Sequence, residues 1–418
     1  MFEWEKDVLP FAEKAEEKAK KAFFEIDRTA FFRQKQVLTA FQNARISTEC
    51  FNPTTGYGYN DLGREKLDRV FAEVFEAESA FARHSIASGT HGITIALFGL
   101  LRPGDVMLSA AGTPYDTLRP VIGLCGEKGA GSLADFGVRY EEVDLLPDNR
   151  LNLEEIVRRL GPEVKMVYLQ KSPGYSNRRA LSNRDVKELH DAIRAAGSKA
   201  FLVVDNCYTE FCEEHEPCYY GADLCVGSLI KNPGGGMAES GAYIAGTEKA
   251  VFLCAQRFTS AGLGLEIGAT LGNTKNMFKG LFYAPHTVAQ ALKTAVFASA
   301  LFEEMGFSAI PASGDKRPDI VQLIQMKKPE LVEAFCKGLQ SASPIDSHVL
   351  PIPWDMPGYQ DPVIMAAGAF TQGSSIELSA DAPMREPFTV YFQGGLTYES
   401  AKIGIISAAN EVYKAMKK

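Results

Sequence analysis

The chain has 418 residues, of which 46% are hydrophobic, 44 are Lys or Arg and 52 are Asp or Glu, giving a formal net charge of −8. This apolar content is sufficient for a packed core and excludes a disordered chain, and the length predicts two or three domains. The acidic balance gives no support for general nucleic-acid binding.

The sequence pattern predicts neither a membrane-spanning helix nor a secretory signal. The longest nearly uninterrupted apolar stretch, residues 93–101, is far shorter than the roughly 20 residues that a membrane span needs. The N-terminus opens with acidic residues and continues as a charged helix, whereas a secretory signal has a basic start and an apolar run. We therefore expect a cytoplasmic protein with no transmembrane helix.

The 8 cysteines contain no C-x-x-C pair and are expected to be reduced thiols. Four of them lie close together in the sequence and could suggest a metal site. Their spacings match no zinc-ligand pattern, so no metal site is predicted. These four are Cys207, Cys212, Cys218 and Cys225.

The first predicted elements are helical. Residues 5–45 carry alternating charges with a Phe-rich inner face, which predicts a helical arm, and we assign residues 1–50 to it. A second amphipathic helix is predicted between Arg64 and Glu78. Its apolar stripe recurs at helical spacing and consists of Leu67, Val70, Phe71, Val74 and Phe75.

The middle of the chain alternates strands with helices. Strands are predicted at residues 105–110, 164–170 and 199–205, with helices at 152–161 and 182–197, the latter starting with a Ser182–Asp185 capping box. This alternation predicts a parallel sheet covered by helices, on which ligands lie beyond the carboxyl ends of the strands. The candidates for chemistry are thus Tyr115, residues 170–175, Asp205 and Lys231.

Near Pro285 the pattern changes to a long helix, followed by Pro- and Gly-punctuated segments and strand-like runs such as residues 388–395. We place a domain boundary there. The expected division is a helical arm (1–50), a large domain (51–285) and a small C-terminal domain (286–418).

The most specific pattern is GSLIKNPGGG, in which Lys231 follows a strand-like run and precedes three glycines. A Lys at a strand end, beside backbone without side chains, suits a Schiff base with a carbonyl cofactor. A surface Lys before a loop is the alternative. Asp205 ends the strand VVD and could pair with the protonated nitrogen of a pyridine ring, although an Asp there is often a turn residue.

A phosphate site is predicted where Ser88, Gly89 and Thr90 open an apolar helix, because a helix start offers free N–H groups and a positive dipole end to an anion. An ordinary helix cap is the alternative. The chain contains neither a P-loop motif nor a dinucleotide-binding G-x-G-x-x-G after a strand, so nucleotide binding is disfavoured.

Taken in order, these features resemble fold-type I pyridoxal-phosphate enzymes, and more narrowly the cystathionine and methionine γ-lyase group. The sequence is most similar to the methionine γ-lyase-like branch often called aluminium resistance proteins, in the stretches NPTTGYGYNDLGREKLDRVFAEVF, ASGTHGI, VVDNCYTEF, GSLIKNPGGG and REPFTVYFQGGLTY. The resemblance implies an α/β fold with a mainly parallel sheet in the large domain and a smaller α+β C-terminal domain. It implies pyridoxal 5'-phosphate as the cofactor.

The resemblance also implies residue roles. Lys231 would hold the cofactor aldehyde and then shuttle protons, and Asp205 would form a salt bridge with the pyridine nitrogen. Tyr115 would stack on the ring and could protonate the leaving group. The phosphate would be held by the Gly89 and Thr90 backbone and by the Ser88 and Ser228 hydroxyls.

In the family, a tyrosine of the neighbouring subunit reaches the same phosphate, and Tyr57 or Tyr59 lies in the matching segment. This implies a homo-oligomer, a dimer with shared active sites that pairs into a tetramer. The family's companion arginine is missing, with Gly58 near its place. Contact with the ring hydroxyl could pass to Ser172, Tyr175 or Asn177, and Arg385 is the expected partner of the substrate carboxylate.

The resemblance implies a carbon–sulfur lyase that cleaves a sulfur amino acid of the cystathionine or methionine class, by β- or γ-elimination, to a thiol, ammonia and a 2-oxo acid. Other reactions on the same scaffold remain open: γ-replacement synthesis, transamination or aldol cleavage. A non-enzymatic metal-tolerance protein is a further alternative. The expected partner is a small amino acid, with no nucleic acid and no membrane.

Overall fold

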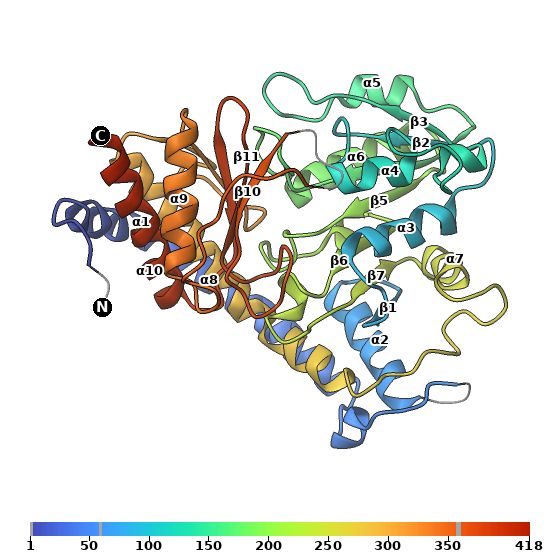
Figure 1. Cartoon of the computed structure of the whole chain (residues 1–418). Helices are drawn as coiled ribbons and strands as arrows, with labels where there is room; N and C mark the ends of the chain where they lie inside the picture. Colours follow the sequence, from blue (N-terminus) through green and yellow to red (C-terminus); the bar gives the residue numbers. More distant parts are fainter. Residues whose placement is uncertain (1–2, 58–60, 357–360) are drawn as a thin grey trace.

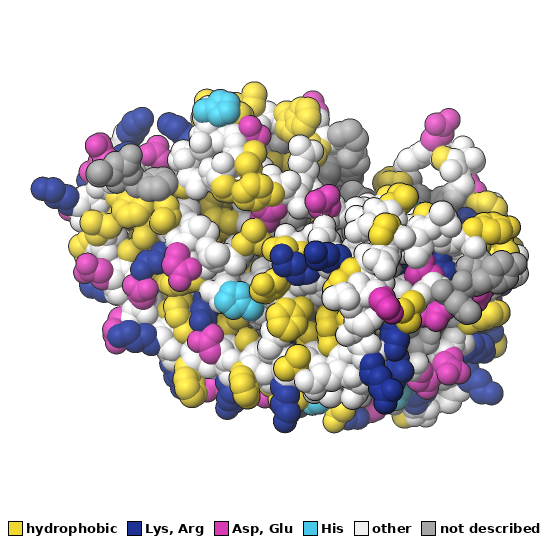
Figure 2. Space-filling model, turned by 90° about the horizontal axis from the view of Figure 1, so that it is seen from below, with side chains coloured by type: hydrophobic (Ala, Val, Ile, Leu, Met, Phe, Trp, Pro, Cys, Tyr) yellow, Lys and Arg dark blue, Asp and Glu magenta, His cyan; other side chains and the backbone are white. Residues whose placement is uncertain are grey.

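The computed structural model describes residues 3–57, 61–356 and 361–418. Figure 1 shows two units, each with its own sheet, and two long helices that run together along one side of both. In the part of the chain that the structure describes, none of the helices has the length and apolar character required to cross a membrane. On the face seen in Figure 2, charged side chains of both signs are interspersed with hydrophobic ones.

The larger unit contains a seven-stranded sheet with the order β1-β7-β6-β5-β4-β2-β3. Strands β3, β2, β4, β5 and β6 run parallel to one another, whereas β7 runs antiparallel to both β6 and β1. The predicted, mainly parallel sheet is thus confirmed. The strands are β1 (Ser79–Arg83), β2 (Val106–Ser109), β3 (Arg139–Glu142), β4 (Val164–Gln170), β5 (Phe201–Asp205), β6 (Leu224–Ser228) and β7 (Ala242–Gly246).

Helices cover both faces of this sheet (Figure 1). The predicted amphipathic stripe of α2 is buried, and the predicted capping box of α6 is present, with Ser182 and Asp185 exchanging hydrogen bonds. The helices are α2 (Leu62–Val74), α3 (Gly89–Leu100), α4 (Arg119–Ile122), α5 (Leu153–Arg158), α6 (Asn183–Ala195) and α7 (Glu248–Phe258). Short 3-10 turns lie at Thr48–Phe51, Asp116–Leu118, Ala134–Phe136, Pro217–Tyr220 and Asn232–Gly234.

The smaller unit contains an antiparallel sheet with the order β10-β11-β12-β9-β8. Alternate residues, among them Ala380, Val390 and Phe392, pack in one core with the two covering helices. The opposite face is turned toward the large unit, because Thr389 and Tyr391 line the cleft between loops of both. The elements are β8 (Ser308–Ile310), β9 (Gln322–Gln325), α9 (Pro329–Ser341), β10 (Val363–Ala366), β11 (Ser379–Pro383), β12 (Thr389–Gln393) and α10 (Tyr398–Met416).

The two long helices are α1 (Leu9–Asn43) and α8 (Thr274–Glu304). Helix α1 confirms the predicted N-terminal helix. Helix α8 begins before Pro285, where the sequence pattern predicts its start, because buried Phe278 and Leu281 hold the preceding turns in the core. A proline removes one backbone hydrogen bond but leaves such packing in place. The expected boundary after residue 285 therefore lies inside α8, and the division into domains stays a prediction.

Candidate active site

Lys231 lies just after β6, on a turn that only glycines can form. A Cβ on Gly234 would fall 1.5 Å from the Leu229 carbonyl oxygen, and Gly235 and Gly236 have φ values of +53° and +76°. The Nζ atom of Lys231 lies 3.8 Å from the centroid of the Tyr208 ring. The glycines that accompany Lys231 in the sequence thus form the tight turn that fixes its backbone.

Asp205 ends β5, the strand beside β6, so it lies at the same sheet edge as Lys231. Its carboxylate is buried and accepts hydrogen bonds from the Tyr168 hydroxyl (3.2 Å) and the Cys207 backbone N–H (3.1 Å). Burial raises the pKa of Asp205, and the nearby charge of Lys231 opposes this rise. A buried carboxylate at a strand end can serve as the anionic partner of a cationic ring nitrogen.

The charge of Lys231 depends on the same neighbours. Burial by itself would lower the pKa of the ammonium group, but the acidic groups around it, Cys207, Tyr208 and Asp205, outweigh this effect, so the pKa lies above its ordinary value. A covalent bond between the Lys231 nitrogen and a carbonyl carbon would remove the ammonium charge. The buried Asp205 carboxylate would then require another cation nearby.

The start of α3 meets these strand ends. The Ser88 hydroxyl accepts the His91 backbone N–H (3.1 Å), and the first helical N–H groups have no partner within the helix. A Cβ on Gly89 would lie 3.2 Å from both Cys207 Sγ and Ser228 Cβ, so α3 approaches the ends of β5 and β6 closely. The structure thus brings together the predicted phosphate ligands Ser88, Gly89 and Ser228.

Tyr115 follows β2 and faces the same place. Its hydroxyl lies 3.0 Å from Thr90 Oγ1, and its backbone N–H donates to Gln170 Oε1 at 2.9 Å. Burial raises the pKa of Tyr115, and the negative charge of Asp205 raises it further. The hydroxyl therefore keeps its proton and can donate a hydrogen bond within the site.

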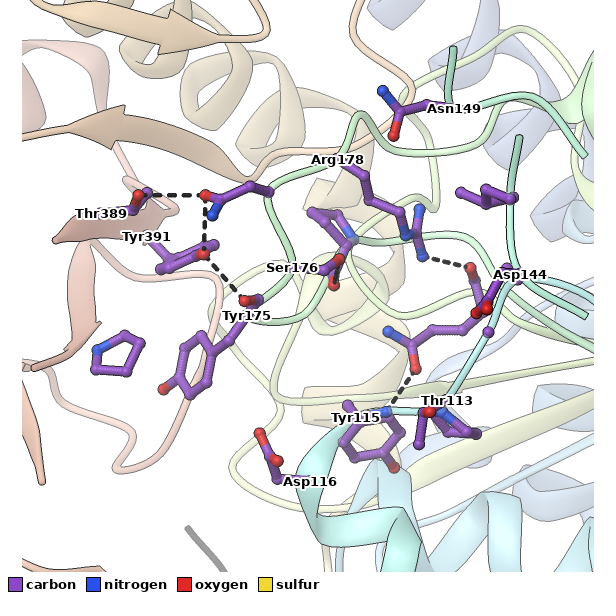
Figure 3. A pocket seen from close by; sticks show the side chains of 18 of the residues that line it. Thr113, Tyr115, Asp116, Asp144, Asn149, Tyr175, Ser176, Arg178, Thr389 and Tyr391 are labelled. Carbon is purple, nitrogen blue, oxygen red and sulfur yellow. Dashed lines mark hydrogen bonds between the residues drawn. The ribbon is translucent and has the colours of Figure 1, made fainter. Parts of the chain in front are cut away.

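A cleft of about 590 Å³ opens between the loops of the large unit and β11–β12 of the small one. Figure 3 shows Tyr115, Tyr175, Arg178 and Tyr391 around it. Arg385 also lines the cleft; its side chain is 48% exposed and its Nη1 lies 3.0 Å from Asp361 Oδ2. Arg385 can therefore reach a ligand from the rim.

A second arginine, Arg178, also lines the cleft, and the sequence pattern does not predict it as a site residue. Its guanidinium is buried and donates to the backbone carbonyls of Lys171, Arg179, Gln170 and Ser172. Burial lowers its pKa to about 10. These four carbonyl contacts show that Arg178 shapes the loop after β4.

The three candidates for the ring-hydroxyl contact all tie this loop to the small unit. The Ser172 hydroxyl donates to Asp319 Oδ2 at 3.0 Å. Asn177 Oδ1 accepts from the hydroxyls of Thr389 (3.2 Å) and Tyr391 (3.3 Å), and the Tyr175 carbonyl accepts from Tyr391 (3.0 Å) (Figure 3). Their role toward a cofactor ring stays open.

Of the two tyrosines expected to reach a neighbouring subunit, Tyr57 is described by the structure. Tyr57 is 77% exposed and pairs with Ile267 through an isolated β-bridge. Tyr59 lies outside the described residues. A role for either in a second subunit stays a prediction.

The cysteine group does not form one cluster. Cys218 and Cys225 approach each other with 3.5 Å between their Sγ atoms, whereas Cys207 lies against Gly89 at the helix start. Among residues 3–57, 61–356 and 361–418, no group of three or more His, Cys, Asp or Glu side chains is arranged to hold a metal ion.

A family profile of methionine gamma-lyases matches residues 8–413. The chain belongs to this family. A carbon-sulfur lyase involved in aluminum resistance from Clostridium novyi has 47% sequence identity and a TM-score of 0.94, covering 97% of this chain and 96% of its own. An uncharacterized protein of Bacillus subtilis, YnbB, is 46% identical over 377 residues, 90% of each chain.

More distant matches bear on the fold and on named activities. The pyridoxal-5'-phosphate dependent protein YhfS of Escherichia coli shares the fold, with a TM-score of 0.59, 18% identity and coverage of 93% of this chain and 97% of its own. An L-methionine gamma-lyase of Pseudomonas putida is 28% identical over 196 residues, 46% of this chain and 43% of that protein. The expected fold class, that of fold-type I pyridoxal-phosphate enzymes, is thus confirmed.

Proposed function

We propose that this protein is a pyridoxal-phosphate-dependent carbon–sulfur lyase that cleaves a sulfur amino acid, of the cystathionine or methionine class, by β- or γ-elimination. One observation carries the proposal: Lys231 follows β6, buried Asp205 ends the adjacent β5, and the open start of α3 packs against the ends of both strands. Membership of the methionine gamma-lyase family supports it. The Clostridium novyi relative, a carbon-sulfur lyase, supports the same reaction class.

The residues present fit the cofactor. Lys231 would bind its aldehyde carbon, and Asp205, oriented by Tyr168 and the Cys207 N–H, would face the ring nitrogen. The helix start at Gly89 and Thr90, with the hydroxyls of Ser88 and Ser228, would hold the phosphate. A side chain larger than hydrogen at Gly89 would press against Cys207 and Ser228, so this position keeps the cradle open.

The bound cofactor supplies an electron sink that acidifies the Cα–H of the attached amino acid. The Lys231 nitrogen, when it is not bonded to the cofactor, would act as the base that takes the Cα proton. The protonated Tyr115 hydroxyl can donate to the departing sulfur as the C–S bond breaks. The sulfur would leave as the thiol with the donated proton, and addition of water to the remaining unsaturated fragment would release ammonia and a 2-oxo acid, which balances the reaction.

The cleft favours an amino acid substrate held at both ends. Arg385 at the rim offers a planar cation to a carboxylate, the geometry that a bidentate pair requires. We also propose a dimer with shared active sites, pairing into a tetramer, in which Tyr57 or Tyr59 approaches the phosphate of the neighbouring subunit. The high exposure of Tyr57 supports this arrangement.

The test is to incubate cofactor-loaded protein with L-cystathionine and identify the 2-oxo acid released. Pyruvate shows β-cleavage and 2-oxobutyrate γ-cleavage. Lys231→Ala should lose both the product and the visible absorption of the bound cofactor, whereas the exposed Lys128→Ala should lose neither. Cofactor-loaded wild-type protein that releases no 2-oxo acid from any sulfur amino acid would contradict the proposal.

A further inference from the structure

Asp381 is a buried carboxyl group on the cleft-facing side of the small sheet. It lies in the middle of β11 and pairs with Tyr391 of β12 across the sheet. Side chains alternate along a strand, so Asp381 shares its face with Pro383, which lines the cleft, and Tyr391 does so on β12. Its strand neighbours Ala380 and Ala382 point the other way, into the core with α9 and α10.

The surroundings of Asp381 are aromatic and hydroxyl-rich. The Tyr175 hydroxyl hydrogen-bonds to its carboxylate, and the Tyr175 ring lies 5.2 Å from the ring of Tyr391. Tyr208, whose ring carries Lys231 Nζ at 3.8 Å, is within electrostatic reach of Asp381. The carboxylate is thus close to the reacting end of the site.

Asp381 has no ion-pair partner within 4.0 Å among the residues that the structure describes, although only 8% of its surface is exposed. Burial raises its pKa to about 7, and the Tyr175 hydrogen bond and the charge of Lys231 oppose this rise. A buried carboxylate without a cation is costly, and an arriving cation would relieve that cost.

We propose that Asp381 binds a second ammonium group at the far end of the substrate. The preferred substrate is then an amino acid thioether with an amine on both sides of the sulfur. This inference rests on the proposed function and narrows its substrate class. A compact cation suits the site because it can bond the Asp381 carboxylate directly, beside the paired rings of Tyr175 and Tyr391.

The carboxylate at the reacting end of the substrate must lie elsewhere, and the distal carboxylate, which shares a carbon with the distal ammonium, must point away from Asp381. A carboxylate beside Asp381 would face a like charge in a poorly hydrated place, which disfavours binding. Arg385, which lines the cleft at its rim, offers the opposite charge to a carboxylate. Methionine, whose far end is an uncharged methyl group, would leave Asp381 without a partner.

The test compares L-cystathionine with the analogue that lacks only the distal amine, which is S-(3-carboxypropyl)-L-cysteine if the enzyme cleaves at Cβ and S-(2-carboxyethyl)-L-homocysteine if it cleaves at Cγ. The wild-type protein should favour cystathionine by about tenfold to a hundredfold in kcat/KM, mainly through KM, the range expected for a charged hydrogen bond. Asp381→Asn should reduce that preference at least tenfold, and Tyr175→Phe should reduce it less. Ser379→Ala is the matched control, because Ser379 lies on the same strand face but bonds Gln393.

Binding measurements distinguish the proposed ammonium site at Asp381 from the proposed lyase reaction. The dissociation constants of both compounds are also measured from the change in visible absorption of the bound cofactor. Turnover with the same preference in wild type and Asp381→Asn would overturn the role of Asp381 and leave the lyase intact. Protein that releases no product would contradict the lyase, while an Asp381-dependent preference in binding would still support the ammonium site, and equal binding of both compounds would overturn it.

Discussion

At the scale of single residues, Arg385 is the cation best placed at the rim for a substrate carboxylate. It lines the cleft, and its ion pair with Asp361 is half-exposed and therefore easily exchanged for a ligand. Arg385→Ala should raise KM for the amino acid by about tenfold to a hundredfold, with a smaller effect on kcat, because it removes a charged hydrogen bond.

Steady-state kinetics with L-cystathionine measures this effect. Arg150→Ala is the matched control, since Arg150 forms a comparable exposed ion pair with Asp148 outside the residues that line the cleft. A KM that is the same for the two variants would exclude Arg385 as the carboxylate partner.

The sequence predicts some site residues and not others for a physical reason. Lys231 and Asp205 are predictable because each ends a strand, and the ends of neighbouring parallel strands must meet. The position of Tyr208 is not predictable from the sequence, because its side chain reaches Lys231 through a left-handed backbone conformation, with φ of +71°. Asp381 is also not predictable as a site residue, because it comes from a separate sheet whose placement depends on tertiary packing.

At the scale of elements, the N-terminal helix supports the segment that follows β5. Arg33 of α1 is buried and forms an ion pair with Glu216, which also accepts hydrogen bonds from Asn206 (3.0 Å) and the Phe211 N–H (3.0 Å). Tyr208 and Phe211 both have positive φ in this segment, a conformation that costs energy for residues other than glycine. The ion pair therefore holds a strained segment beside Asp205.

Arg33→Met should lower the free energy of unfolding by about 3–5 kcal/mol, because it leaves Glu216 buried without its cation. Arg28→Met removes an exposed ion pair with Glu25 on the same helix and should cost no more than about 1 kcal/mol. Urea unfolding followed by circular dichroism measures both. Equal losses would show that the buried pair does not stabilise the segment.

The elements themselves were largely predictable, since periodicity is a local property. The strands at β2, β4 and β5 and the helices α2 and α6 follow from alternation, apolar stripes and a capping box. The start of α8 is not predictable in this way. Pro285 is a local signal for a helix boundary, but the buried turns before it continue the helix through the proline. Local signals fail where tertiary packing decides.

At the scale of the whole molecule, the arrangement of subunits decides whether one chain suffices for activity. If Tyr57 or Tyr59 completes the site of a neighbouring subunit, a site needs Lys231 from one chain and the tyrosines from another. Lys231→Ala and the double variant Tyr57→Ala/Tyr59→Ala should each be inactive alone. Co-expressed, they should recover about a quarter of wild-type activity, because half of the dimers are hybrids and each hybrid has one intact site.

The matched control is co-expression of Lys231→Ala with Asp205→Ala. Both residues end adjacent strands of the same chain, so every hybrid carries one defect in each site and no activity should return. Recovery with the tyrosine variant and none with the Asp205 variant requires that the tyrosines act across the interface. Equal absence of recovery, from hybrids shown to form by differential tagging, would mean that each chain builds its site alone and that exposed Tyr57 has another role.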